Sequence, residues 1–127
     1  MDSNKYNPLK YLAKRRNDLE LSQKALRDAE KIASFLSRRC GAEVYGIGSL
    51  FESDRDFSRR SDIDLVVRGI PARDFFLISG EAAYLTDFRL DIIPYEDAND
   101  LIREAVRERG FCYEKRCNDN DSYKERS

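Results

Sequence analysis

Three aspartates set in two apolar stretches are the residues of this sequence best suited to chemistry. Asp62 and Asp64 belong to the strand-like run 62–68, and Asp91 interrupts the strand-like run 88–93. A carboxylate is costly to bury unless its charge is compensated. Because residues i and i+2 of a strand face the same way, Asp62 and Asp64 are expected to project side by side. Two like charges so close raise each other's pKa unless a cation lies between them.

A divalent cation is the simplest compensation for these charges. If the strand of Asp91 lies next to that of Asp62 and Asp64, the three carboxylates form an oxygen-rich site for one or two Mg²⁺ or Mn²⁺ ions and substrate phosphates. The chain contains no histidine, which excludes Ser-His-Asp and Cys-His catalysis and every zinc site that uses histidine. Carboxylates therefore remain the strong metal ligands of this sequence.

The pair Gly48-Ser49 supplies groups suited to a phosphate. A tight glycine turn exposes backbone N–H groups, and the serine hydroxyl adds a donor. Nucleotidyl transfer needs little more than metals, donors for the phosphates and a carboxylate near the attacking hydroxyl. Each piece alone also fits an ordinary turn or a surface strand, but the combination is more specific. No P-loop is present, and Asp54 and Asp56 are assigned to a loop without a chemical role, because Arg59 occupies the glycine position of a calcium loop.

The helices and strands that position these residues are predicted from the residues that begin or end such elements and from the periodicity of the apolar residues. The apolar spacing predicts one long helix from Pro8 to a stop at Gly41, and Asp97 or Asn99 can cap the last helix. The fold class is α/β or α+β: a small mixed β-sheet with helices packed on one side, preceded by the long helix. The expected order is helix 8–39, strand 43–47, polar connection 50–61, strand 62–68, helix 71–80, strand 88–93, a helix ending at 109, and a short strand or turn at 111–113.

Length and composition place the chain among single-domain cytoplasmic proteins. Its 127 residues are 41% apolar and 37% charged, so we expect one domain over 1–114 and a charged, disordered tail over 115–127. No apolar run is long enough for a membrane helix, and three cysteines without paired spacing favour a reducing cytosol. Residues 1–42 carry ten basic and five acidic side chains, whereas residues 43–97 carry six and twelve. The basic segment is either an ordinary solvated surface or a face that meets a polyanion or an acidic partner. Its helix either docks on the domain or projects its first half toward a partner, and direct nucleic-acid binding is not expected.

The stretches "GIGSL", "SDIDLVV", "RLDIIPYEDA" and "REAVRERGFCYE" together resemble the minimal nucleotidyltransferase family of the DNA polymerase beta-like superfamily. The resemblance covers the chain from residue 20 to 114. It implies a polymerase beta-like nucleotidyltransferase fold in which Gly48 and Ser49 hold the nucleotide phosphates. By the same resemblance Asp62 and Asp64 bind the metals, and Asp91 completes the site and assists the attacking hydroxyl.

Many proteins of this family are antitoxins paired with a HEPN-family toxin, and the resemblance implies transfer of AMP from ATP to a toxin tyrosine. Because the chain is too short for a second lobe, the acceptor must come from a partner or from a second copy of the chain. The alternative is an antitoxin or accessory subunit that neutralises its partner by contact alone. The basic helix favours this alternative. So does a departure from the family pattern: where the family often has Ala-Arg-Gly, this chain has Phe51, Glu52 and Ser53. Arg55, Arg59 or Arg60 are candidates to replace the arginine that Glu52 displaces.

Overall fold

The computed structural model describes residues 8–51 and 62–113. The predicted tail at 115–127, most of the connection 50–61, and the candidate arginines within that connection lie outside these residues. Among the helices of the described part, none combines the length and apolarity needed to cross a bilayer.

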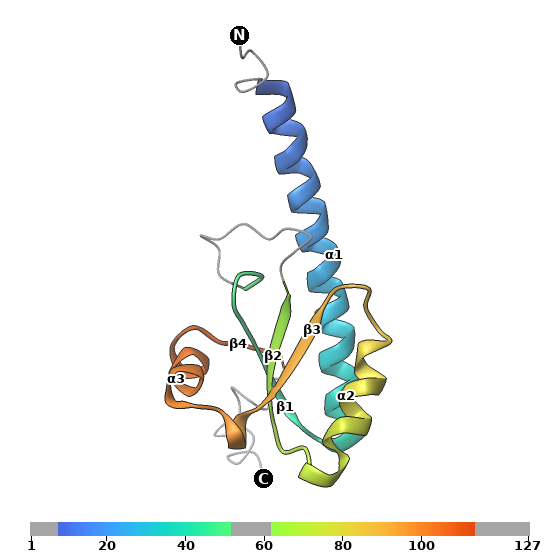
Figure 1. Cartoon of the computed structure of the whole chain (residues 1–127), viewed down its shortest axis with the longest axis vertical. Helices are drawn as coiled ribbons and strands as arrows, with labels where there is room; N and C mark the ends of the chain where they lie inside the picture. Colours follow the sequence, from blue (N-terminus) through green and yellow to red (C-terminus); the bar gives the residue numbers. More distant parts are fainter. Residues whose placement is uncertain (1–7, 52–61, 114–127) are drawn as a thin grey trace, which may run out of the picture.

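Helix α1 (Pro8–Cys40) confirms the predicted long N-terminal helix and continues one residue further. Gly41 ends it with φ +68°, and the Gly41 N–H donates to the Ser37 carbonyl at 2.8 Å. A left-handed glycine of this kind satisfies a free carbonyl of the last turn. Figure 1 shows α1 extending well past one end of the sheet, so only its C-terminal part packs on the domain.

The sheet has four strands in the order β3-β2-β1-β4. Its members are β1 (Glu43–Ile47), β2 (Ile63–Arg68), β3 (Leu90–Pro94) and β4 (Phe111–Cys112). β1 is antiparallel to both β2 and β4, whereas β2 and β3 are parallel. The long helix and the mixed sheet confirm the predicted fold class. Because β1 reverses the direction of α1 after the Gly41 turn, β1 ends at the end of the sheet from which α1 projects (Figure 1).

The helices after the sheet's second strand are close to their predicted positions. A short 3-10 turn η2 (Ala72–Asp74) leads into α2 (Phe75–Ala83), which extends three residues past the predicted end at Gly80. A second 3-10 turn, η3 (Tyr95–Asp97), follows β3 and precedes α3 (Asp100–Arg109). Of the two predicted caps, Asn99 is used: its side-chain oxygen accepts from the Ile102 N–H at 2.9 Å.

Successive side chains of β2 point to opposite faces of the sheet, and one of these faces packs in the core. Ile63, Leu65 and Val67 are fully buried against side chains of α1 and α2. Asp62 and Asp64 therefore project to the other side. α3 is the exception to single-sided packing, because Figure 1 shows it across the sheet from α1 and α2. In agreement, its buried Val106 is not part of the main core cluster.

Candidate metal and nucleotide site

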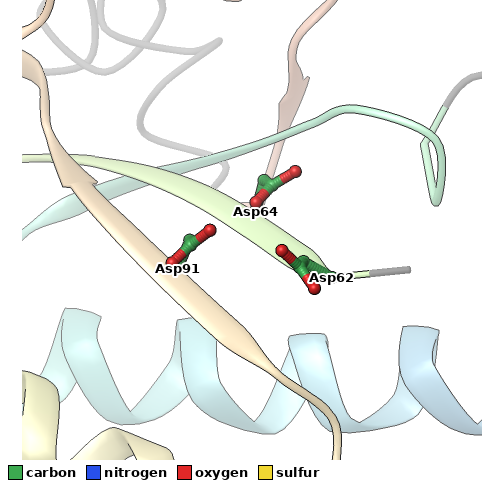
Figure 2. A group of neighbouring side chains, drawn as sticks. All are labelled: Asp62, Asp64 and Asp91. Carbon is green, nitrogen blue, oxygen red and sulfur yellow. The ribbon is translucent and has the colours of Figure 1, made fainter. Parts of the chain in front are cut away.

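The pairing of β2 with β3 brings together the three aspartates. In the parallel register Asp64 stands opposite Asp91, and Asp62 precedes Asp64 by two residues on the same face. Figure 2 shows the three carboxylates close together on these two neighbouring strands. One oxygen from each lies within 4.8 Å of the others. The predicted convergence is confirmed, while the role of the cluster as a metal site stays a prediction.

These separations suit a small divalent ion. Oxygen ligands about 2.1 Å from Mg²⁺ lie about 3 Å apart when adjacent and about 4.2 Å apart when opposite. Side-chain torsions could draw oxygens now up to 4.8 Å apart into such a shell. Asp62 and Asp64 are partly buried and Asp91 is exposed, so the site opens to solvent on the Asp91 side. The three carboxylates could therefore hold a metal and still admit a substrate.

The electrostatics of the cluster centre on Asp64. Burial is the largest cause that raises the pKa of this carboxyl, and together with the charges of Asp91 and Asp62 and a hydrogen bond with Asp91 it brings the pKa to about 6. Without a cation, the protonated form of Asp64 is thus favoured well above the usual range of an aspartate. A divalent ion reverses this preference, because it stabilises the ionised carboxylate.

Arg89 is a cation at the edge of the cluster that the sequence interpretation did not single out. Its Nε lies 3.9 Å from Asp62 Oδ2, and the side chain is 79% exposed. The backbone holds it there, because the Ile63 N–H donates to the Arg89 carbonyl at 2.8 Å. Its position two residues before Asp91 was a usable signal, since alternate residues share a face. Arg89 therefore places an exposed positive charge beside the carboxylates.

The Gly48 turn lies directly against the carboxylates. Gly48 has φ +89°, and the turn is closed by the Phe51 N–H, which donates to the Gly48 carbonyl at 3.0 Å. A β-carbon built on Gly48 would stand 2.9 Å from Asp64 Oδ2. The backbone at Gly48 thus comes as close to Asp64 as the absence of a side chain permits. Ser49 follows Gly48 within this turn; its predicted contact with phosphate stays a prediction.

Phe51 anchors the far side of the turn. Its ring occupies the space that a side chain at Gly46 would need. It also stacks on Phe111, with ring centroids 6.0 Å apart, and meets Tyr113 edge-on at 5.9 Å. The sequence comparison treated Phe51 as a departure from the family pattern, whereas the structure shows it as a hydrophobic anchor. Glu52 and Ser53, the rest of that departure, lie outside the described residues.

A partly buried polar contact fixes the segment that leads into β3. The Asp28 carboxylate on α1 accepts from the Thr86 hydroxyl at 2.7 Å and pairs with Lys24 at 3.5 Å. The same Thr86 oxygen accepts from the Phe88 N–H at 3.1 Å. This contact ties β3, and with it Asp91, to the helix layer. Nothing in the sequence pattern predicted it, because Asp28 and Thr86 are 58 residues apart.

Comparison with known proteins identifies the fold. No protein-family model matches the chain, and no curated protein is similar to it in sequence. A solved structure that is similar is a crystal structure of a toxin-antitoxin with AMP-PNP. The match has a TM-score of 0.58 and 19% identity, and it covers 74% of this chain and 79% of the other. At this identity the likeness establishes a shared fold.

Proposed function

We propose that this chain is a metal-dependent nucleotidyltransferase that transfers AMP from ATP to a hydroxyl group of a partner protein, as the antitoxin of a HEPN-type toxin. The observation that carries the proposal is the convergence of Asp62, Asp64 and Asp91 beside the Gly48 turn. The shared fold with a toxin-antitoxin structure that contains AMP-PNP supports it.

The residues of the site have three roles in this proposal: they bind the metal, they bind the phosphates, or they accept the proton. Asp62 and Asp64 hold Mg²⁺ or Mn²⁺, which neutralises phosphate charge and favours attack at phosphorus. Gly48 and Ser49 donate hydrogen bonds to the phosphates. Asp91, the exposed member, accepts the proton of the acceptor hydroxyl. The hydroxyl oxygen bonds to the α-phosphorus as the bond to the pyrophosphate leaving group breaks.

The acceptor is the part of the reaction that this chain does not supply. Within the described residues, the Asp91 side of the site is open to solvent. A partner protein, or a second copy of the chain, can present the hydroxyl there, and a tyrosine has the reach to enter an open site from a folded surface. Blocking an essential tyrosine of a toxin would make the reaction an antitoxin activity.

The test is an AMP-transfer assay with paired charge variants. The chain is incubated with Mg²⁺, α-labelled ATP and the co-expressed partner toxin. We expect label on the partner with the wild type and none with Asp62→Asn/Asp64→Asn. Asp87→Asn is the control, because Asp87 is an exposed aspartate outside the cluster. Label that persists in the double variant would refute the assigned site.

The second candidate is an antitoxin that acts by contact alone. The observation that favours it is the uncovered N-terminal half of α1, where Leu12 and Leu19 are each 57% exposed. The same assay separates the two functions. Absence of label, together with toxin neutralisation that survives Asp62→Asn/Asp64→Asn, would support contact and exclude AMP transfer as the antitoxin mechanism.

A further inference from the structure

α1 carries a row of apolar residues that continues beyond the domain. Leu12, Leu19, Leu26 and Ala33 are spaced seven apart, so they follow one face of the helix. Ala33 is 1% exposed within the core, Leu26 is 40% exposed, and Leu19 and Leu12 are each 57% exposed. We call Leu12, Leu19 and Leu26 the leucine seam. The seam is thus the open continuation of a row whose other end is buried.

The part of α1 that carries the seam receives little cover from the described residues of its own domain. Within the described residues, the first α1 side chain that packs against the core is Leu21. A helix of 33 residues is about 50 Å long, so a substantial length lies past the sheet. Figure 1 shows this projection. Since most helical stability in proteins comes from packing of an apolar face, an uncovered seam indicates a binding surface.

The charges around the seam indicate what kind of partner covers it. Residues 8–24 contain five basic side chains and two acidic ones, Asp18 and Glu20, a net charge of 5 − 2 = +3. Asp18 is paired within the helix, since Lys14 Nζ lies 3.4 Å from its Oδ2. A second copy laid along the seam would place two basic segments side by side. Like charges oppose that contact, whereas an acidic helix complements it.

We propose that the leucine seam binds an acidic amphipathic helix of a partner protein in a coiled-coil arrangement. β1 ends and β2 begins at the end of the sheet from which α1 projects, so the Gly48 turn and the aspartate cluster lie at that same end (Figure 1). A partner held on the seam is therefore close to the open site. The role of the seam in delivering an acceptor hydroxyl rests on the proposed function, but the binding itself does not.

The binding is tested with the full chain and defined peptides, without metal or nucleotide. One peptide has about three heptads with leucine at a and d and glutamate at e and g, and a second has lysine in place of each glutamate. Titration calorimetry should show binding of the acidic peptide that weakens as salt is added. The lysine peptide should bind at least about tenfold more weakly, which corresponds to about 1.4 kcal/mol.

Matched variants locate the contact. Leu12→Asp/Leu19→Asp should weaken binding of the acidic peptide at least about tenfold. Leu77→Asp on α2 should leave it unchanged, because Leu77 is 59% exposed but lies away from the seam. The three substituted leucines, Leu12, Leu19 and Leu77, lie outside the buried core. Circular dichroism and the melting temperature should therefore match the wild type in each variant.

Two results would overturn the proposal. The first is equal binding of both peptides, or binding that the double variant leaves intact. The second is a wild-type dimer in sedimentation that the double variant dissolves, which would assign the seam to a second copy. Neither result bears on AMP transfer. Conversely, if the chain binds the acidic peptide but transfers no AMP, the proposed binding at the seam stands and the proposed enzymatic function is refuted.

Discussion

Gly48 and Asp64 are in direct apposition: a β-carbon at residue 48 would lie 2.9 Å from Asp64 Oδ2. The glycine of the turn and the most perturbed carboxyl of the cluster are therefore parts of a single site. Phosphate donors and metal ligands have to be adjacent in this way if a metal ion is to bridge the protein and a nucleotide. This apposition makes Gly48 the most informative single position to change.

Gly48→Ala is expected to abolish metal-dependent activity. The left-handed conformation, φ +89°, costs a side-chain-bearing residue about 1–2 kcal/mol, and the new methyl displaces the Asp64 carboxylate. Gly41→Ala is the control, since Gly41 has φ +68° and open space around its β-carbon position. Both variants should be destabilised in urea denaturation. Only Gly48→Ala should lose Mn²⁺ binding in calorimetry; equal losses would show that strain alone is responsible.

Metal binding should strengthen as pH rises through about 6, the pKa of Asp64 in the metal-free fold. Because this folded-state pKa is raised above the unfolded value, the folded chain binds more protons between about pH 4 and 6, and metal-free stability falls as pH rises through that window. Since a metal requires the ionised carboxylate, the melting-temperature increase caused by Mg²⁺ should be larger at pH 7.5 than at pH 5.

Asp64→Asn provides the check on this pH dependence. The amide removes the proton exchange and the like-charge repulsion with Asp62 and Asp91. Metal-free stability at neutral pH should therefore rise relative to the wild type, and its fall between about pH 4 and 6 should flatten. The response to Mg²⁺ should disappear. A wild-type pH profile in this variant would assign the titration to another group.

Thr86→Val should destabilise the fold and lower activity together. It removes the hydroxyl that donates to buried Asp28 and accepts from the Phe88 N–H. Asp28 keeps its ion pair with Lys24, but losing the hydroxyl donor to a buried carboxylate costs about 1–3 kcal/mol. Thr86→Ser keeps the hydroxyl and should retain most of both properties. If Thr86→Val retains wild-type activity at a temperature where it is fully folded, the contact is unnecessary for the position of Asp91.

Phe51→Ala should loosen the Gly48 turn from the sheet. The variant leaves the space beside Gly46 empty and removes the ring contacts with Phe111 and Tyr113. We expect a loss of about 2–3 kcal/mol in urea unfolding, below the full range for buried phenylalanines because Phe51 is partly buried. We also expect a higher KM for ATP. Phe51→Leu should show smaller effects of both kinds, and an unchanged KM in Phe51→Ala would separate the anchor from the nucleotide site.

Local patterns predicted the elements and much of the site. Pro8 and Gly41 bracket the long helix, Asn99 caps α3, and the i, i+2 spacing of Asp62 and Asp64 puts both side chains on one face. These features depend on residues close together in the chain, where backbone geometry alone fixes the outcome. The prediction that the helices pack on one side of the sheet does not hold for α3 (Figure 1). The apolar pattern of a helix does not specify which face of a sheet that helix will cover.

The sequence by itself determined that two carboxylates stand side by side next to a glycine turn, because strand periodicity and glycine chemistry are local. Only the tertiary structure decided that Asp91 is opposite Asp64, that Phe51 fills the space at Gly46, and that Asp28 holds Thr86. Each of these three contacts depends on strand register or on packing between elements. Those choices minimise the free energy of the whole chain, so no short segment encodes them.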